Sequence, residues 1–165
     1  MDVYRIVKEP YHEAPYDPLS YIGSMTNGGG RWNPARIGVL YTATSPALAL
    51  VETMAHFPNL TYSQLPGLHL LTIQIPEDDD AIFWIDPLAL PTYWRTGTLM
   101  ETQSIFIDWM ESPFSLALAV PSVIIDVSYN LLLHPEHPLY SETKLLYQSK
   151  LSFDQRLWRY TPPIS

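Results

Sequence analysis

The chain has 165 residues, of which 47% are hydrophobic and 16% charged, and its net charge is −8. This size and composition favour a single folded domain over residues 1–165 and exclude intrinsic disorder of the whole chain. The absence of cysteine excludes disulfides and thiolate metal sites, and an acidic chain with 9 basic residues is a poor candidate for binding nucleic acid or an anionic membrane directly.

The first part of the chain predicts two short strands around a long irregular region. Residues 3–7 predict a strand, and residues 39–42 predict a buried one. Residues 9–38 hold repeated Pro and Gly and predict an irregular segment. A loop of this length inside a compact domain is usually functional or mobile.

A helix follows over about residues 46–57. Ser45 is a good N-cap, and Pro46 fits the first helical position because its missing N–H would have no partner there. Pro58 is expected to end the helix.

The second half predicts more strands than helices. Apolar stretches predict strands at residues 68–75, 81–85, 116–120, 123–127 and 144–151, and the apolar stripe of residues 101–111 predicts a helix. We expect the tail after Trp158 to be loose. The pattern predicts an α+β fold with short helices around a mixed or antiparallel sheet.

Known nucleotide-binding patterns are absent. The sequence has no G-x-G-x-x-G and no Walker-type loop, and strands do not alternate regularly with helices. A doubly wound fold is therefore not expected.

The glycine-rich segment Gly28–Pro34 is the first candidate site. Glycines let the backbone approach a ligand closely, Arg31 could clamp a carboxylate or phosphate, and Trp32 could offer a flat face to a ring. The alternative is an ordinary turn whose Arg pairs with one of the many acids.

The second candidate is Glu52, an acid in the middle of an otherwise apolar helix. A carboxylate in such surroundings is costly unless it is paired, and is often functional. Alternatively, Glu52 marks a narrow solvent-facing stripe with His56. His134 and His137 could form a metal pair, but a rigid loop is the favoured interpretation, and no metal site is predicted.

Tyr41, Ser122 and Arg5 are the remaining candidates. Tyr41 ends a buried strand, and Ser122 follows a Pro that interrupts an apolar stretch. Arg5 is the one charged residue inside residues 3–7. Each also has a structural explanation: a core aromatic with a bonded hydroxyl, a bulge capped by its hydroxyl, and an Arg paired with an acid. Together with Glu52 and Arg31, they could hold an anionic ligand that carries an aromatic ring.

The order of motifs resembles the RES domain family over about residues 3–157. The resemblance rests on Tyr4-Arg5, on Gly29–Pro34, on Val39–Thr42, on Ser45–Glu52, on Val120–Ser122 and on Asn130–Pro135.

The resemblance implies a fold similar to that of ADP-ribosyltransferases. It also implies the toxin of a toxin–antitoxin pair that depletes NAD⁺ by hydrolysis or phosphorolysis of the nicotinamide–ribose bond. NAD⁺ would be the substrate, with no further cofactor. The partner would be an Xre-like helix-turn-helix antitoxin that contacts DNA in the toxin's place.

The resemblance also implies roles for individual residues. Glu52, Arg5 and Tyr41 would be catalytic, with Glu52 as the key carboxylate. Arg31, Trp32 and Ser122 would bind substrate. No role is assigned to His56, Asn130, Trp94 or Arg95.

Two other functions remain open at this stage. Some members of the family transfer ADP-ribose to a protein, and the chain could also be a catalytically silent binding module. Neither a transmembrane run nor a secretory signal is visible, so we expect a cytoplasmic protein.

Overall fold

The computed structural model describes residues 1–26, 28–57, 60–78 and 81–157. The strands are β1 (Asp2–Lys8), β2 (Leu40–Ala43), β3 (Leu68–Gln74), β4 (Ile82–Trp84), β5 (Ala117–Pro121), β6 (Tyr129–Leu133) and β7 (Lys144–Lys150). The helices are α1 (Ile22–Thr26), α2 (Pro46–Met54) and α3 (Met100–Glu111), with short 3₁₀ turns between elements. The predicted α+β class is confirmed.

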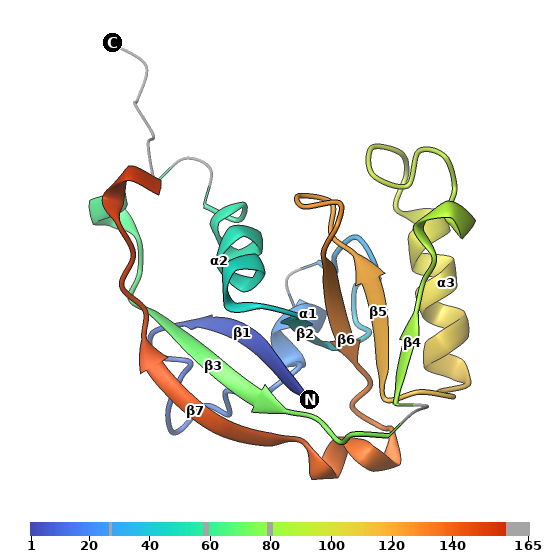
Figure 1. Ribbon diagram of the computed structural model, residues 1–165, viewed down its shortest axis with the longest axis horizontal. Helices are drawn as coiled ribbons and strands as arrows, with labels where there is room; N and C mark the ends of the chain where they lie inside the picture. Colours follow the sequence, from blue (N-terminus) through green and yellow to red (C-terminus); the bar gives the residue numbers. More distant parts are fainter. Residues whose placement is uncertain (27, 58–59, 79–80, 158–165) are drawn as a thin grey trace.

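The strands form one mixed sheet in the order β4-β5-β6-β2-β1-β3-β7. The pair β4–β5 is parallel, and every other pair is antiparallel. The pairing between β1 and β2 is short, with Tyr4 opposite Ala43. By contrast, β1 pairs with β3 along its whole length. Figure 1 shows the result: β1, β3 and β7 form one wing of the sheet, and β2, β6, β5 and β4 form the other.

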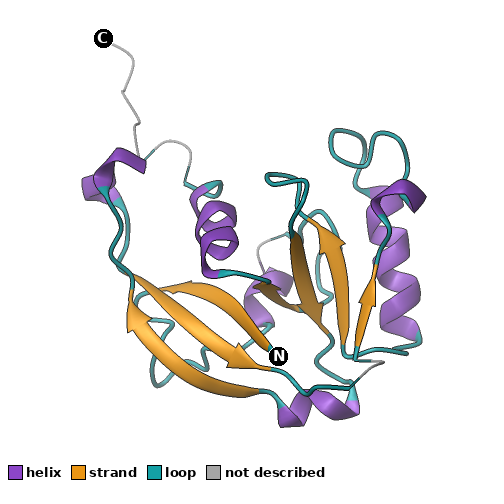
Figure 2. Ribbon diagram, in the orientation of Figure 1, coloured by secondary structure: helices purple, strands orange, loops and turns teal. Residues whose placement is uncertain are grey.

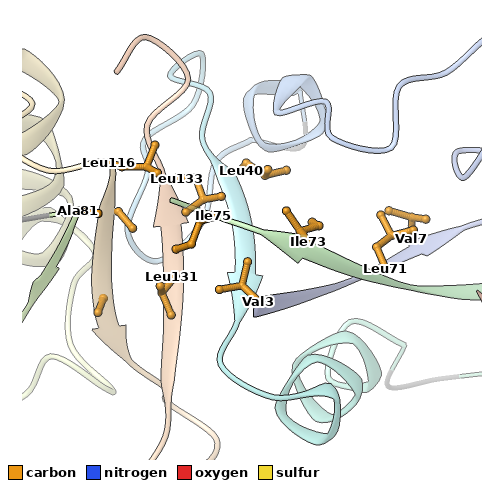
Figure 3. Close-up of a cluster of buried hydrophobic side chains, with 12 residues drawn as sticks. Val3, Val7, Leu40, Leu71, Ile73, Ile75, Ala81, Leu116, Leu131 and Leu133 are labelled. Carbon is orange, nitrogen blue, oxygen red and sulfur yellow. The ribbon is translucent and has the colours of Figure 1, made fainter. Parts of the chain in front are cut away.

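The main core lies on one face of this folded sheet. Val3 and Val7 of β1 pack there with residues of both wings, including Leu40, Leu71 and Leu131 (Figure 3). Because neighbouring strand residues point to opposite faces, Tyr4 and Ile6 lie on the other face.

The helices α2 and α3 cover that other face. Tyr4 and Ile6 pack beside Leu48 and Ala49 of α2. α3 buries Phe106 and Trp109 against a second apolar cluster, which includes side chains of β5 and β6. In Figure 2 the two helices stand on either side of the β5–β6 hairpin.

One predicted strand was wrong. Residues 123–127 form a loop, and the strand begins later, at Tyr129. The reason is local: the Ser122 hydroxyl accepts the N–H groups of Ile124 and Ile125, at 3.1 and 3.0 Å, and turns the chain. β-branched residues favour strands, but this side-chain cap overrides their preference.

Two smaller expectations also change. The region 9–38 contains the short helix α1, and α2 ends at Met54, before the expected limit at residue 57. The tail that was expected to be loose, residues 158–165, lies outside the described residues. Among the described residues, no helix is long and apolar enough to cross a membrane.

Candidate active site

Glu52 is placed by a helix whose start is well defined. The Ser45 side chain accepts the N–H of Leu48 at 3.2 Å, and Pro46 occupies the first turn, as the sequence predicts. Leu48 and Ala49 are buried against the sheet. Glu52 is half-buried, one turn further along the helix.

Two side chains hold the Glu52 carboxylate in place. The Ser122 hydroxyl donates to Glu52 Oε1 at 2.7 Å, and the Asn130 amide donates to the same oxygen at 2.6 Å. Within the described part of the chain, no hydrogen bond reaches Oε2. One carboxylate oxygen is therefore fixed, and the other is available to a ligand.

Strand pairing brings these two partners beneath α2. Asn130 of β6 lies opposite Ala43 of β2 on one side and Val120 of β5 on the other. Ser122 follows directly after β5 and is fully buried. Glu52 is thus anchored to the β5–β6 hairpin by residues 70 and 78 positions away in the sequence.

Tyr41 of β2 lies opposite Leu132 of β6. Because Asn130 is two residues from Leu132 on the same strand, Tyr41 and Asn130 point to the same face of the sheet. The Tyr41 hydroxyl donates to Asn33 Oδ1 at 2.7 Å. Burial raises the pKa of Tyr41 to about 12, and the nearby Glu52 charge acts in the same direction. The phenol is therefore neutral at physiological pH, and Glu52 is close enough to act on it.

The glycine-rich segment is a tight turn packed against this tyrosine. Gly29 has a φ of +81°, and a Cβ there would lie 2.6 Å from the backbone oxygen of Asn33. The N–H of Gly30 donates to that same oxygen at 2.8 Å, and a Cβ on Gly30 would lie 3.1 Å from the Tyr41 hydroxyl. Glycine is required here by close approach.

Helix α3 fixes the segment from the other side. The Thr102 hydroxyl donates to the Arg31 carbonyl at 2.6 Å, and the Gln103 amide donates to the Gly30 carbonyl at 2.9 Å. The backbone on both sides of the Gly30–Arg31 bond is therefore held in one position.

Arg31 extends toward the loop of residues 91–99. Its Nη1 donates to the carbonyl of Trp94 at 2.7 Å, and among the described residues no carboxylate pairs with it. Arg95 contacts Asp126 at 3.8 Å, so the 91–99 loop also reaches the loop that follows Ser122. In Figure 1 these two loops and α2 all lie toward the upper edge of the molecule.

Trp32 does not offer a face to a ligand. It is 3% exposed and packs with Trp94, their ring centroids 6.0 Å apart, in the cluster under α3. The sequence suggested a stacking platform, but the structure places Trp32 in the core, where a large aromatic side chain is most stable.

Arg5 lies away from Glu52. It shares the face of β1 with Val3 and Val7, opposite the face that α2 covers. Its Nη1 donates to the carbonyl of Ser20 at 3.0 Å, and burial lowers its pKa to about 10. The structure does not bring Arg5 to the Glu52 cluster.

The histidine pairs considered as metal ligands have other contacts. His56 is exposed beyond the end of α2, so it does not share a helical face with Glu52. His134 contacts the carbonyl of Met110 at 3.1 Å, and His137 caps the following 3₁₀ turn. Among the described residues, no group of three or more potential ligands could hold a metal ion.

Sequence reasoning missed Asn130 and Asn33. Asn130 belongs to a motif already noted, but its role depends on β6 lying next to β2, and β6 was not predicted as a strand. Asn33 is 1% exposed; it accepts from Tyr41 and donates to the Ile37 carbonyl at 2.9 Å. The signal available in the sequence was a polar residue three positions after Gly30.

Chemically, the cluster offers a neutral phenol and a fixed carboxylate, one oxygen of which receives no hydrogen bond from the described residues. A carboxylate held in this way can stabilise positive charge at a sugar carbon, or accept a hydrogen bond from a sugar hydroxyl.

Comparison with known proteins gives a consistent result. A family model described as the RES domain matches residues 2–155. The protein "Toxin Res" of Yersinia enterocolitica is 36% identical over 160 residues, which cover 95% of this chain and 99% of that protein. The "Prs ADP-ribosylating toxin" of a Sphingobium species is 34% identical over 146 residues, covering 87% and 88%.

A solved structure shares the fold. It is a chain of the M. tuberculosis MbcT–MbcA toxin–antitoxin complex, with a TM-score of 0.69 and 20% identity. The match covers 94% of this chain and 85% of that chain.

Proposed function

The chain belongs to the RES domain family, and we propose that it is the toxin of a toxin–antitoxin pair that cleaves NAD⁺ at the nicotinamide–ribose bond. The observation that carries this proposal is the Glu52 carboxylate, whose Oε1 is held by Ser122 and Asn130 while no described residue bonds to Oε2. The two named relatives support it: the Yersinia protein is called Toxin Res, and the Sphingobium protein is called an ADP-ribosylating toxin.

The proposed reaction breaks the C–N bond between the ribose and nicotinamide. The bonding electrons leave with nicotinamide, which becomes neutral, and positive charge develops on the ribose. Glu52 Oε2 would accept a hydrogen bond from the 2′-hydroxyl and stabilise this charge, as carboxylates do in glycosidic cleavage generally. Water or phosphate then bonds to the anomeric carbon, and any proton released goes to solvent.

Rigid placement is what makes this carboxylate suitable. A group already oriented toward the developing charge does not have to reorganise during the reaction. Ser122 and Asn130 supply this orientation for Glu52. Tyr41, neutral and fixed by Asn33, would position the ribose or the nicotinamide ring beside the carboxylate.

A direct test is to incubate the purified protein with NAD⁺, with and without phosphate, and to follow nicotinamide by chromatography. The mass of the second product identifies the acceptor: ADP-ribose indicates water, and ADP-ribose 1″-phosphate indicates phosphate. Absence of nicotinamide release in both buffers would contradict the proposed cleavage.

Transfer of ADP-ribose to a protein is the second candidate, because the Sphingobium relative is named as an ADP-ribosylating toxin. It uses the same bond cleavage and differs in the acceptor. NAD⁺ labelled in the adenosine part, added to a cell lysate, separates the two: label bound to protein supports transfer, and label in small molecules supports depletion.

We also propose a helix-turn-helix antitoxin of the Xre type as the partner. The structural relative comes from a toxin–antitoxin complex, and the low basic content of this chain suits a toxin that leaves DNA contacts to another protein. Expression alone should arrest growth, and co-expression of the antitoxin should restore it. Unimpaired growth with the toxin alone would contradict this assignment.

A further inference from the structure

Trp94 contacts two arginines through different parts of the residue. Its carbonyl accepts the hydrogen bond from Arg31 Nη1 at 2.7 Å, and the guanidinium carbon of Arg95 lies 5.3 Å from the centre of its ring. Trp94 itself is 6% exposed and packs in the cluster under α3, so its position is fixed by the core. Two guanidinium groups are thus held at one residue.

In the part of the chain that the structure describes, neither arginine has a strong acidic partner. Arg31 is bonded to a neutral carbonyl. Arg95 pairs with Asp126 at 3.8 Å, and the two side chains are 42% and 66% exposed. An exposed pair at that distance lacks the two short parallel bonds that make an arginine–carboxylate contact strong. Most of the N–H donors of both groups therefore have no hydrogen-bond acceptor among the described residues.

The Arg95–Asp126 contact involves the loop that follows Ser122. Asp126 belongs to the loop that begins at Ser122, whose hydroxyl holds Glu52. In the same loop, Val123 packs toward the Trp94 cluster and Ile125 packs toward α2. The Arg95–Asp126 contact thus joins the loop that holds Glu52 to the 91–99 loop, which carries Arg95 and the carbonyl that Arg31 contacts.

We propose that Arg95 adds a second guanidinium to Arg31, the expected substrate-binding arginine, so that the two clamp the pyrophosphate of a dinucleotide, and that Asp126 is the counter-ion which the pyrophosphate replaces on Arg95. This inference rests on the proposed function, because it places the nicotinamide ribose at Glu52. Two guanidinium groups match the charge and the planar, bidentate geometry that phosphate oxygens favour. Asp126 then sets the affinity, since it must leave before the ligand binds.

The test measures the equilibrium binding of ADP-ribose by calorimetry, because this molecule keeps the pyrophosphate and needs no cleavage. Arg95→Gln should weaken binding about tenfold or more, because it removes charge-assisted hydrogen bonds. Asp126→Asn should strengthen binding several-fold, because it removes the competing charge without changing the shape of the side chain.

The chain offers a matched control pair. Arg156 and Asp154 also form an exposed arginine–aspartate pair, at 2.9 Å, in a part of the chain that lies far from the 91–99 loop in Figure 1. Arg156→Gln and Asp154→Asn make the same charge changes and should leave ADP-ribose binding unchanged. If the control variants changed ADP-ribose binding as much as Arg95→Gln and Asp126→Asn, net charge alone would explain the effects, and the clamp would be overturned.

The results separate the clamp from the proposed function. If the wild type binds ADP-ribose with the expected changes in the variants but releases no nicotinamide from NAD⁺, the clamp stands and the cleavage is wrong. If the wild type cleaves NAD⁺ and Arg95→Gln alters neither ADP-ribose binding nor KM, the clamp is wrong. Failure of the wild type to bind ADP-ribose overturns the clamp as well.

Discussion

The Ser122 hydroxyl lies 2.7 Å from Glu52 Oε1 and donates its proton to that oxygen. The same hydroxyl accepts the backbone N–H groups of Ile124 and Ile125, which leaves its hydrogen directed at the carboxylate. One fully buried serine therefore ends β5, shapes the following loop and orients the acid on α2.

Replacing Ser122 should affect both stability and activity. Ser122→Ala removes the acceptor of two backbone N–H groups, and we expect the free energy of unfolding to fall by about 1–3 kcal/mol. It also removes one of the two bonds that hold Glu52, so kcat for nicotinamide release should fall about 10-fold to 100-fold. Denaturant unfolding and steady-state kinetics measure the two effects, and unchanged kcat in a folded variant would show that Ser122 does not position Glu52.

Asn130 provides a test of the second bond. Asn130→Asp keeps the size of the side chain but places a like charge 2.6 Å from Glu52 Oε1, whereas Asn130→Ala only removes the donor. We expect kcat at neutral pH to be lower in Asn130→Asp than in Asn130→Ala, because like charges repel at this distance. Equal kcat values in the two variants would argue against the short contact.

Gly28 and Gly29 form a matched pair for the glycine-rich turn. Their φ values are +80° and +81°, but only at Gly29 would a Cβ meet other backbone atoms, with open space at Gly28. Gly28→Ala should cost about 1 kcal/mol for its backbone strain alone, and Gly29→Ala should cost clearly more. Thermal unfolding of the two variants gives the difference, and equal costs would contradict the tight packing of this turn.

The pKa of Tyr41, raised to about 12, predicts how stability changes in alkali. A native pKa above the unfolded value means that the native state holds its proton longer, so this contribution is fully present at lower pH. It is lost as the pH rises from about 10 to about 12. The free energy of unfolding of the wild type should fall by about 2 kcal/mol more than that of Tyr41→Phe over this range.

The control for this measurement is Tyr93→Phe, because Tyr93 is 72% exposed. It should show the same alkaline loss of stability as the wild type. If Tyr41→Phe also matches the wild type, Tyr41 is not buried beside Glu52 in the way described.

Much of the site could be predicted from local signals. The Ser45-Pro46 start of α2 and the apolar helix around Glu52 are local patterns, and the structure has both. The glycines before Arg31 indicated a close backbone approach, which is found at Gly29. These features depend on a few neighbouring residues, so one sequence is enough to reveal them.

The missing parts depend on contacts between distant residues. Residues 123–127 have strand-forming side chains, but the hydroxyl of Ser122 turns the chain there. The role of Asn130 required the pairing of β6 with β2. Arg5 alternates with Val3 and Val7 along β1, so it lies on the strand face that packs into the main core. This periodicity predicts its position better than the rarity of arginine in the chain predicts a catalytic role.

The measurement that tests the central claim most directly is nicotinamide release from NAD⁺ by the wild type and by Glu52→Gln. The amide keeps the size of the side chain and an oxygen that can accept from Ser122 and Asn130, but it removes the negative charge. We expect release by the wild type and a loss of about 100-fold or more in the variant. Equal rates from the two folded proteins would contradict the claim that the Glu52 carboxylate carries the reaction.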